Sequence, residues 1–223
     1  MNSEIEYQGR KARRAGSEQR RKAILEAALR IIVRDGIRNV RHRAVAREAD
    51  VPLSATTYYF KDISDLIADS FTLFAEQAMT NVIEPFRQQA FQLLDQLGEG
   101  LPSGAAREQL LDQLGVMTAG FILNEVREQR EHLIAEQAFM HEAVLDERLR
   151  ALAVAYNRSQ VEVLEKACAK LGSPDPVMDA EMMMAMVLRY EYLLLLDPDA
   201  LPETELQKRV RAALALLVGT AGE

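Results

Sequence analysis

The chain has 223 residues and 48% of them are apolar, so it can bury a substantial core. Its one cysteine, Cys168, leaves no disulfide framework or thiolate metal cluster. The polar, charged N-terminus does not resemble a secretory signal, and the lack of an apolar run of about eighteen residues predicts no membrane span. Together with the lone cysteine, these features predict a protein of the reducing cytoplasm.

The net charge of −7 hides an uneven distribution. Residues 10–47 contain thirteen Lys and Arg against three acidic residues, a balance of +10, so the other residues sum to −17. Such a split favours a polyanion-binding end on an acidic body, although a solvated basic face explains the charge alone equally well.

The first sixteen residues lack apolar periodicity and predict a flexible basic arm containing Arg10, Lys11, Arg13 and Arg14. Ser17 is the expected N-cap of a first helix that runs to about Arg34, where apolar residues recur at three- and four-residue spacing. Gly36 is expected to end this helix.

Two short helices are predicted next, over residues 42–49 and 52–60, with a tight turn at Asp50. Helix, turn, helix is the geometry that places a second helix in the major groove of DNA. The second helix of the pair is dense in hydroxyl groups, which suit a groove walled by phosphates and floored by donor and acceptor edges. A polar outer face of an ordinary amphipathic helix is the alternative.

The rest of the chain has helical periodicity, with a loop over residues 98–104 and a break or kink at Pro85. No segment alternates with period two for long enough to form a strand, so the expected fold is all-α. The predicted helices begin near residue 62, continue to about 97, and then cover 106–127, 131–142, 146–171, 177–196 and 203–218.

The stretch GIRNVRHRAVAREADVPLSATTYYFKDISDL, residues 36–66, resembles the N-terminal domain of TetR-type transcriptional regulators. The resemblance covers roughly residues 18–70 and includes Gly36, the Val45-Ala46 pair and the aromatic ending Tyr59-Phe60. Asp50 stands where the family usually has glycine, and aspartate tolerates the left-handed conformation. The resemblance implies a basic arm over 1–16, a helix-turn-helix DNA-binding domain over 17–62, and a ligand-binding and dimerisation domain over 63–223.

The expected DNA contacts lie on the two short helices and just beyond them. We expect groove contacts from Ser54, Ala55, Thr56 and Tyr58, and phosphate contacts from Arg41, Arg43, Thr57, Tyr59 and Lys61. Phe60 is expected in the core, and Tyr59 fits the core as well as it fits a phosphate.

The resemblance implies a homodimer through the last two long helices, about 177–196 and 203–218, and an apolar or amphipathic small-molecule effector in the body. The expected pocket residues, which fit an ordinary core equally well, are Met117, Phe121, Asn124, Phe139, Met140 and Tyr156. No catalytic constellation, metal site or cofactor motif is apparent.

Together these observations predict a transcriptional regulator that acts as a repressor. It would bind a palindromic operator in double-stranded DNA, and a small-molecule ligand would release it. One alternative is a DNA-bound architectural or recruiting protein of the same fold that binds a protein partner. A helical enzyme or lipid carrier is a second alternative, which leaves the basic N-terminal region unexplained.

Overall fold

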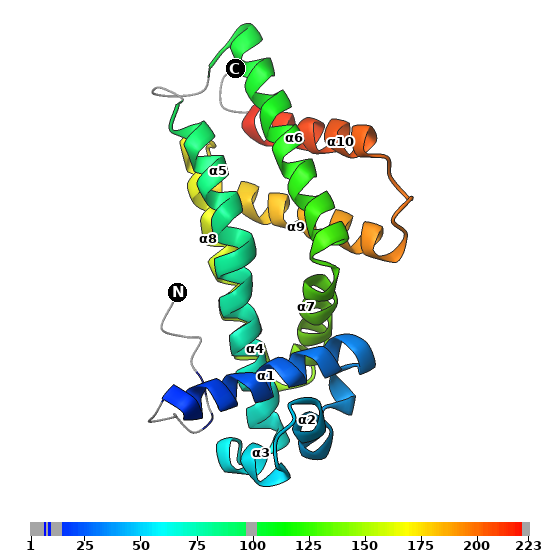
Figure 1. The fold of residues 1–223 in the computed structure, drawn as a ribbon. Coiled ribbons are helices and arrows are strands. Elements are labelled where there is room, and N and C mark those ends of the chain that lie inside the picture. Colours follow the sequence, from blue (N-terminus) through cyan, green and yellow to red (C-terminus); the bar gives the residue numbers. More distant parts are fainter. Residues whose placement is uncertain (1–6, 8, 10–14, 97–101, 220–223) are drawn as a thin grey trace. The chain divides into compact units, whose positions relative to one another are not determined.

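The computed structural model describes residues 7, 9, 15–96 and 102–219, and within these ranges it contains helices and turns but no strand (Figure 1). The all-α prediction is therefore confirmed. The cations Arg10, Lys11, Arg13 and Arg14 of the predicted basic arm lie outside the described residues.

The helices follow the predicted order closely. They are α1 (Ala15–Asp35), the 3-10 turn η1 (Ile37–Asn39), α2 (His42–Glu48), α3 (Leu53–Tyr59), α4 (Ile63–Ala78), the π-helical turn η2 (Met79–Ile83), α5 (Glu84–Leu94), α6 (Gly104–Glu128), α7 (Arg130–Ala143), α8 (Glu147–Lys170), α9 (Pro176–Leu196) and α10 (Glu203–Gly219).

The chain divides by packing into two compact units. The first comprises Met1–Thr80 and Ile134–Asn157, and the second comprises Asn81–Leu133 and Arg158–Glu223. The sequence analysis instead divided the chain at residue 62 by function, into a DNA-binding domain and a ligand-binding and dimerisation domain. That division remains a prediction.

The first unit is built on an apolar core in which α1 packs against α2, α3 and α4. Ile24, Phe60 and Leu66 are fully buried there. Further along α4, the ring of Phe71 meets the rings of Phe139 and Tyr156 edge-on, with centroids 4.9 and 5.9 Å apart. Each such buried side chain contributes about 1.5–3 kcal/mol, so this core fixes the short helices α2 and α3.

The second unit has its own core, in which α6 packs against α9 and α10. Gly115 of α6 permits the close approach of α10, because a Cβ at this position would lie 3.1 Å from the Cβ of Arg211. The guanidinium group of Arg211 also pairs with Glu108 and Asp112 on α6. The inner face of α10 is thus occupied within the chain.

One local expectation is wrong. The first helix begins at Ala15, so Ser17 lies inside it and is not its N-cap. The expected irregularity at Pro85 is present, because the π-helical turn η2 interrupts the helix over the five residues before α5. A proline disturbs the carbonyl group four residues earlier, and that residue lies in η2. The boundary between the two units, at residues 80 and 81, falls in the same turn.

Among the described residues, none of the helices combines the length and the apolar character needed to cross a bilayer.

Candidate nucleic-acid interface

The turn between α2 and α3 has the tight geometry that its sequence predicts. Asp50 adopts the left-handed conformation, with φ of 51°. The amide of Val51 donates to the carbonyl oxygen of Ala46 at 2.9 Å, and Pro52 is the N-cap residue of α3. The turn therefore sets α3 at a fixed angle to α2, as a helix-turn-helix requires.

One face of α3 is exposed, and it includes Leu53, Ser54, Thr57 and Tyr58. Tyr58 is 54% exposed, and Ala55 is half-buried beside this face. These residues form what we call the reading face. Its hydroxyl groups and small side chains have the sizes and hydrogen-bonding groups that contact base edges and phosphates.

Two predicted DNA contacts lie on the opposite, buried face of α3. Thr56 is fully buried, and its hydroxyl donates to the carbonyl oxygen of Leu53 at 2.8 Å. Tyr59 is 5% exposed, and its hydroxyl bonds the Ser17 hydroxyl at 2.8 Å. Both side chains therefore help to anchor α3, and their contacts with DNA remain a prediction.

Phe60 lies in the core, as expected. It is fully buried, and its amide donates to the carbonyl oxygen of Thr56, which ends α3. Helix α4 starts three residues later with Asp62 as its N-cap, whose carboxylate accepts from the amide of Asp65 at 2.8 Å. The chain therefore passes directly from the reading helix into α4.

Exposed cations lie on α2 and immediately after α3 in the chain. Arg41, Arg43 and Lys61 are exposed, and none has a carboxylate partner within the described ranges. Arg38 and Arg47, which the sequence prediction did not include, share both properties. Their exposure leaves these charges available to a polyanion.

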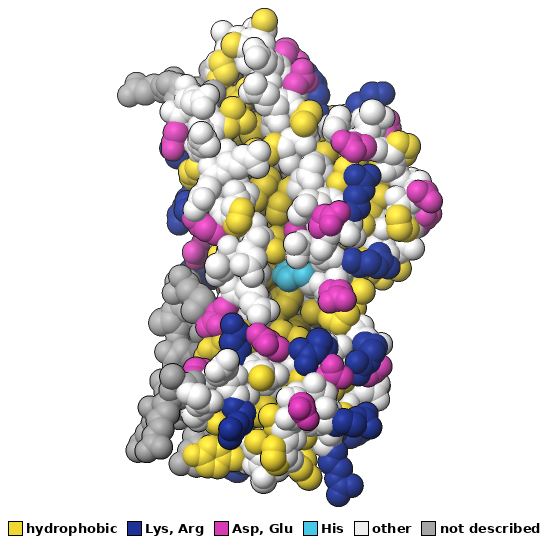
Figure 2. Space-filling view, viewed as in Figure 1, with side chains coloured by type: hydrophobic (Ala, Val, Ile, Leu, Met, Phe, Trp, Pro, Cys, Tyr) yellow, Lys and Arg dark blue, Asp and Glu magenta, His cyan; other side chains and the backbone are white. Residues whose placement is uncertain are grey.

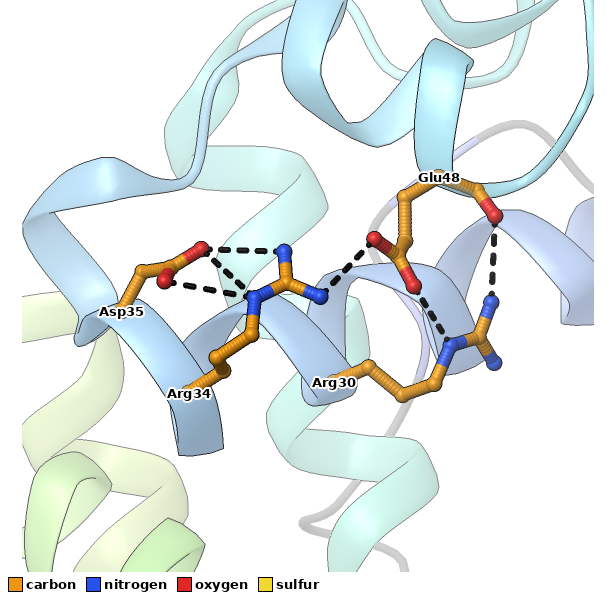
Figure 3. A network of polar contacts seen from close by, with 4 residues as sticks. All are labelled: Arg30, Arg34, Asp35 and Glu48. Carbon is orange, nitrogen blue, oxygen red and sulfur yellow. Dashed lines mark hydrogen bonds and ion pairs between the residues drawn. The ribbon is translucent and has the colours of Figure 1, made fainter.

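Other arginines of the basic region hold α1 and α2 together (Figure 3). Arg30 Nε donates to Glu48 Oε1 at 2.9 Å, and Arg34 Nη1 donates to Glu48 Oε2 at 3.1 Å. These hydrogen bonds lower the pKa of the Glu48 carboxyl, that from Arg30 most. Arg34 also pairs with Asp35. These two arginines are structural, which separates them from the unpaired cations.

Figure 2 shows Lys and Arg side chains gathered at the lower right, over α1 and α2 of the first unit. The uneven charge of the sequence thus becomes a basic surface on the part of the first unit that carries the helix-turn-helix.

Solved structures with the same arrangement cover nearly the whole chain. A TetR-family regulator from Mesorhizobium loti MAFF303099 matches 96% of this chain and 100% of its own, with 17% identity and a TM-score of 0.69. NalD of Pseudomonas aeruginosa, the secondary repressor of the MexAB-OprM multidrug efflux pump, matches 93% and 100%, with 22% identity and a TM-score of 0.58. A transcriptional regulator from Saccharomonospora viridis, solved with choline, matches 87% and 95%, with 16% identity and a TM-score of 0.61.

The chain has the fold of the TetR-family transcriptional regulators. No protein-family model and no curated protein matches its sequence. The named structural neighbours are regulators rather than enzymes.

The six expected pocket residues are divided between the two units, and the pocket remains a prediction. Phe139 and Tyr156 are buried among the aromatic rings of the first unit, and Met140 packs against the same core. The others lie on α6 in the second unit, where Met117 and Phe121 are half-buried and Asn124 is exposed. Within the described residues, no group of three or more His, Cys, Asp or Glu is placed to hold a metal ion.

The second unit presents an exposed apolar stripe on α9. Four large apolar side chains of the stripe are each 46–68% exposed: Met178, Met182, Tyr192 and Leu196. Together with Ala185 and Arg189 they follow one another at alternating spacings of four and three residues. This spacing puts them on one face of the helix, as in helices that pair with another helix. On α10, by contrast, Leu206, Val210 and Leu214 face the core of the chain.

Proposed function

We propose that this chain is a sequence-specific DNA-binding transcriptional regulator of the TetR type, with α3 as the helix that enters the major groove. The observation that carries the proposal is the exposed face of α3, together with exposed cations on α2 and at Lys61 that have no carboxylate partner among the described residues. Phosphate contacts from such cations supply affinity and register, whereas the side chains on α3 supply sequence discrimination.

The experiment that tests this proposal is selection of bound DNA from a random pool, followed by affinity measurements on the selected sequence. Thr57→Val removes an exposed hydroxyl and should weaken specific binding about ten-fold. Thr56→Val, its matched control, removes a buried hydroxyl, so it should lower stability and leave the affinity of the folded protein unchanged.

The alternatives give different results in the same experiment. Binding without sequence preference that falls steeply with salt would support the architectural or recruiting reading. Absence of any salt-dependent binding would contradict both readings, since the basic surface would then have no polyanion partner.

We further propose that the regulator is a homodimer that acts as a repressor on a palindromic operator, in the cytoplasm. A single reading helix contacts few bases, and two linked copies gain both affinity and site length. The exposed stripe on α9 supports the association of two copies of the chain. The repressor named among the structural neighbours supports repression of transcription rather than activation.

Ligand release would be a population shift between two states of the dimer. DNA favours the state in which the two reading helices match successive grooves, and the effector favours another state. Helix α4 would transmit the change between the effector and the reading helix. It begins directly after the reading helix and ends just before the boundary between the two units.

For the effector, we propose a small amphipathic cation bound beside α6. Met117, Phe121 and Glu125 recur at four-residue spacing on this helix. Glu125 is buried, with its carboxylate 3.5 Å from His132 Nδ1, and a buried carboxylate favours a positive charge nearby.

Choline, with which one structural neighbour was solved, is a suitable first probe. A bound ligand raises the melting temperature by mass action. Choline should therefore raise it for the native chain and not for Glu125→Gln, and the uncharged dimethylbutanol isostere should have no effect on either. Equal shifts with both compounds would contradict a role for the carboxylate.

A further inference from the structure

Two residues near the N-terminus form hydrogen bonds with α4, about sixty residues or more further along the chain. The hydroxyl of Tyr7 donates to Glu76 Oε2 at 2.6 Å, and the amide of Gly9 donates to Asp69 Oδ2 at 2.9 Å. Burial and the hydrogen bond to Glu76 raise the pKa of the Tyr7 hydroxyl, so it stays a donor. Tyr7 and Gly9 therefore contact α4 at two residues, Glu76 and Asp69, which lie two turns apart on that helix.

Below this attachment lies a buried ion pair between α1 and α4. Arg21 Nη2 and Asp69 Oδ2 are 2.6 Å apart, and the two side chains are 4% and 0% exposed. The guanidinium carbon of Arg21 lies 4.2 Å from the ring centroid of Tyr7 and 5.7 Å from that of Phe60. Arg21 is therefore held between an aromatic ring of the N-terminal segment and the residue that ends α3.

Gly9 fits this place because it has no side chain. A Cβ there would lie 2.6 Å from Asp69 Oδ2 and 3.0 Å from the ring of Phe60. Neither neighbour moves easily, since Asp69 is buried as the partner of Arg21 and Phe60 is fully buried. A side chain at residue 9 would push directly on the end of the reading helix.

We propose that Tyr7 and Gly9 are positioning residues for DNA reading, which fix the orientation of α3 through Arg21, Asp69 and Phe60. The inference rests on the proposed function for its biological meaning, although the positioning itself does not require DNA. It places part of the reading apparatus outside the helix-turn-helix.

The test compares two glycine variants of the full chain, Gly9→Ala and Gly16→Ala. A Cβ on Gly16 meets nothing within 4 Å, so this variant controls for the loss of a glycine alone. Hydrogen exchange of the α3 amides, measured without DNA, reports on the helix directly. Gly9→Ala should accelerate exchange over residues 56–60 about ten-fold and leave α9 unchanged, and Gly16→Ala should change neither.

Operator binding provides the second readout. Gly9→Ala should weaken binding to the selected sequence about ten-fold and leave binding to random DNA unchanged, because no charge is lost. A purely structural role would instead lower the stability of the whole unit and weaken both kinds of binding together. That result would overturn the inference.

Tyr7→Phe tests the same inference if Gly9→Ala does not fold. It retains the ring over Arg21 and loses only the hydrogen bond to Glu76, and it should shift exchange in α3 in the same direction by a smaller factor. Faster exchange in α3 with no sequence-specific binding by the native chain would support positioning and contradict the proposed function. Unchanged exchange in α3 would overturn the positioning role whatever the DNA result.

Discussion

Arg148, in the first turn of α8, forms an ion pair with Asp65 in the first turn of α4, with Nη1 and Oδ1 3.2 Å apart. The arginine side chain is 59% exposed and that of Asp65 is 19% exposed. The pair joins the start of α4, immediately after the reading helix, to a helix that is distant in sequence.

We predict a small coupling energy for this pair. A double-mutant cycle with Arg148→Ala and Asp65→Ala should give about 0.2–1 kcal/mol from urea unfolding, because exposed ion pairs are screened by water and salt. The coupling should fall in high salt. Arg148 Nη1 also lies 3.9 Å from Asp62 Oδ1, so a value above about 2 kcal/mol would mean that the three charges stabilise one another beyond an ordinary exposed pair.

The two arginines at the start of α2 should contribute to DNA affinity through phosphate contacts. Arg41→Ala and Arg43→Ala should each reduce the slope of log affinity against log salt concentration by about one. Arg30→Ala is the matched control, because Arg30 is exposed but paired with Glu48. An equal change of slope in all three variants would mean that only the net charge matters.

Asp50 should be replaceable by glycine but not by alanine. At φ of 51° an alanine Cβ costs about 1–2 kcal/mol, whereas glycine is free of this strain. We expect the free energy of unfolding to follow the order Gly, Asp, Ala, with Asp50→Ala lower by about 1 kcal/mol than Asp50→Gly. Denaturant midpoints of the three proteins measure this order, and equal midpoints for Gly and Ala would refute it.

The stripe on α9 should mediate dimerisation. Met182→Glu and Leu196→Glu each place a charge at an exposed apolar position of the stripe and should convert the dimer to a monomer in analytical ultracentrifugation. Val154→Glu makes the same change at an equally exposed valine of α8 and should leave the mass unchanged. Dissociation by Val154→Glu alone would place the interface elsewhere.

Cys168 should react slowly with alkylating reagents in the native protein. Burial, and to a lesser extent Asp179, raise the pKa of its thiol to about 11. At pH 8 this leaves about a hundred-fold less thiolate than an ordinary thiol has, and the thiolate is the reactive form. The native rate should keep rising with pH up to about 11, whereas the rate of the urea-unfolded chain should level off near pH 9.

The same shift has a consequence for stability. Because the folded pKa is raised, the contribution of Cys168 is fully present below pH 9 and is lost as the pH rises toward 11. Between these values the unfolded chain releases the thiol proton and the folded chain retains it. Cys168→Ala should therefore flatten the decrease in stability over this range.

Much of the fold follows from the sequence because helical periodicity is a local property. Nearby residues are enough to predict the ends of α2 and α3, the left-handed conformation of Asp50 and the burial of Phe60. They are not enough to predict which face of α3 is buried. The helix has only seven residues, about two turns, and the helices that pack against it decide which face is covered. For this reason the burial of Thr56 and the contact of Tyr59 with Ser17 could not be predicted from the sequence.

Other features depend on contacts between distant residues. Nothing near Tyr7 in the sequence indicates that it meets Glu76, and the pairing of Arg30 and Arg34 with Glu48 is invisible in a count of charges. On α10, Leu206, Val210, Leu214 and Leu217 belong to the core of the chain, whereas Leu216 is 75% exposed, and the predicted interface on this helix remains a prediction.

The two-faced construction of α3 bears on how such a protein acquires new specificities. Leu53, Ser54, Thr57 and Tyr58 lie at the surface, so substitutions there leave the anchoring by Thr56, Tyr59 and Phe60 in place. A library randomised at the four surface positions should therefore contain mostly folded proteins, whereas one randomised at the three anchoring positions should contain few. If α3 reads DNA as proposed, substitutions on its exposed face would change the preferred DNA sequence and leave the buried contacts that hold the helix unchanged.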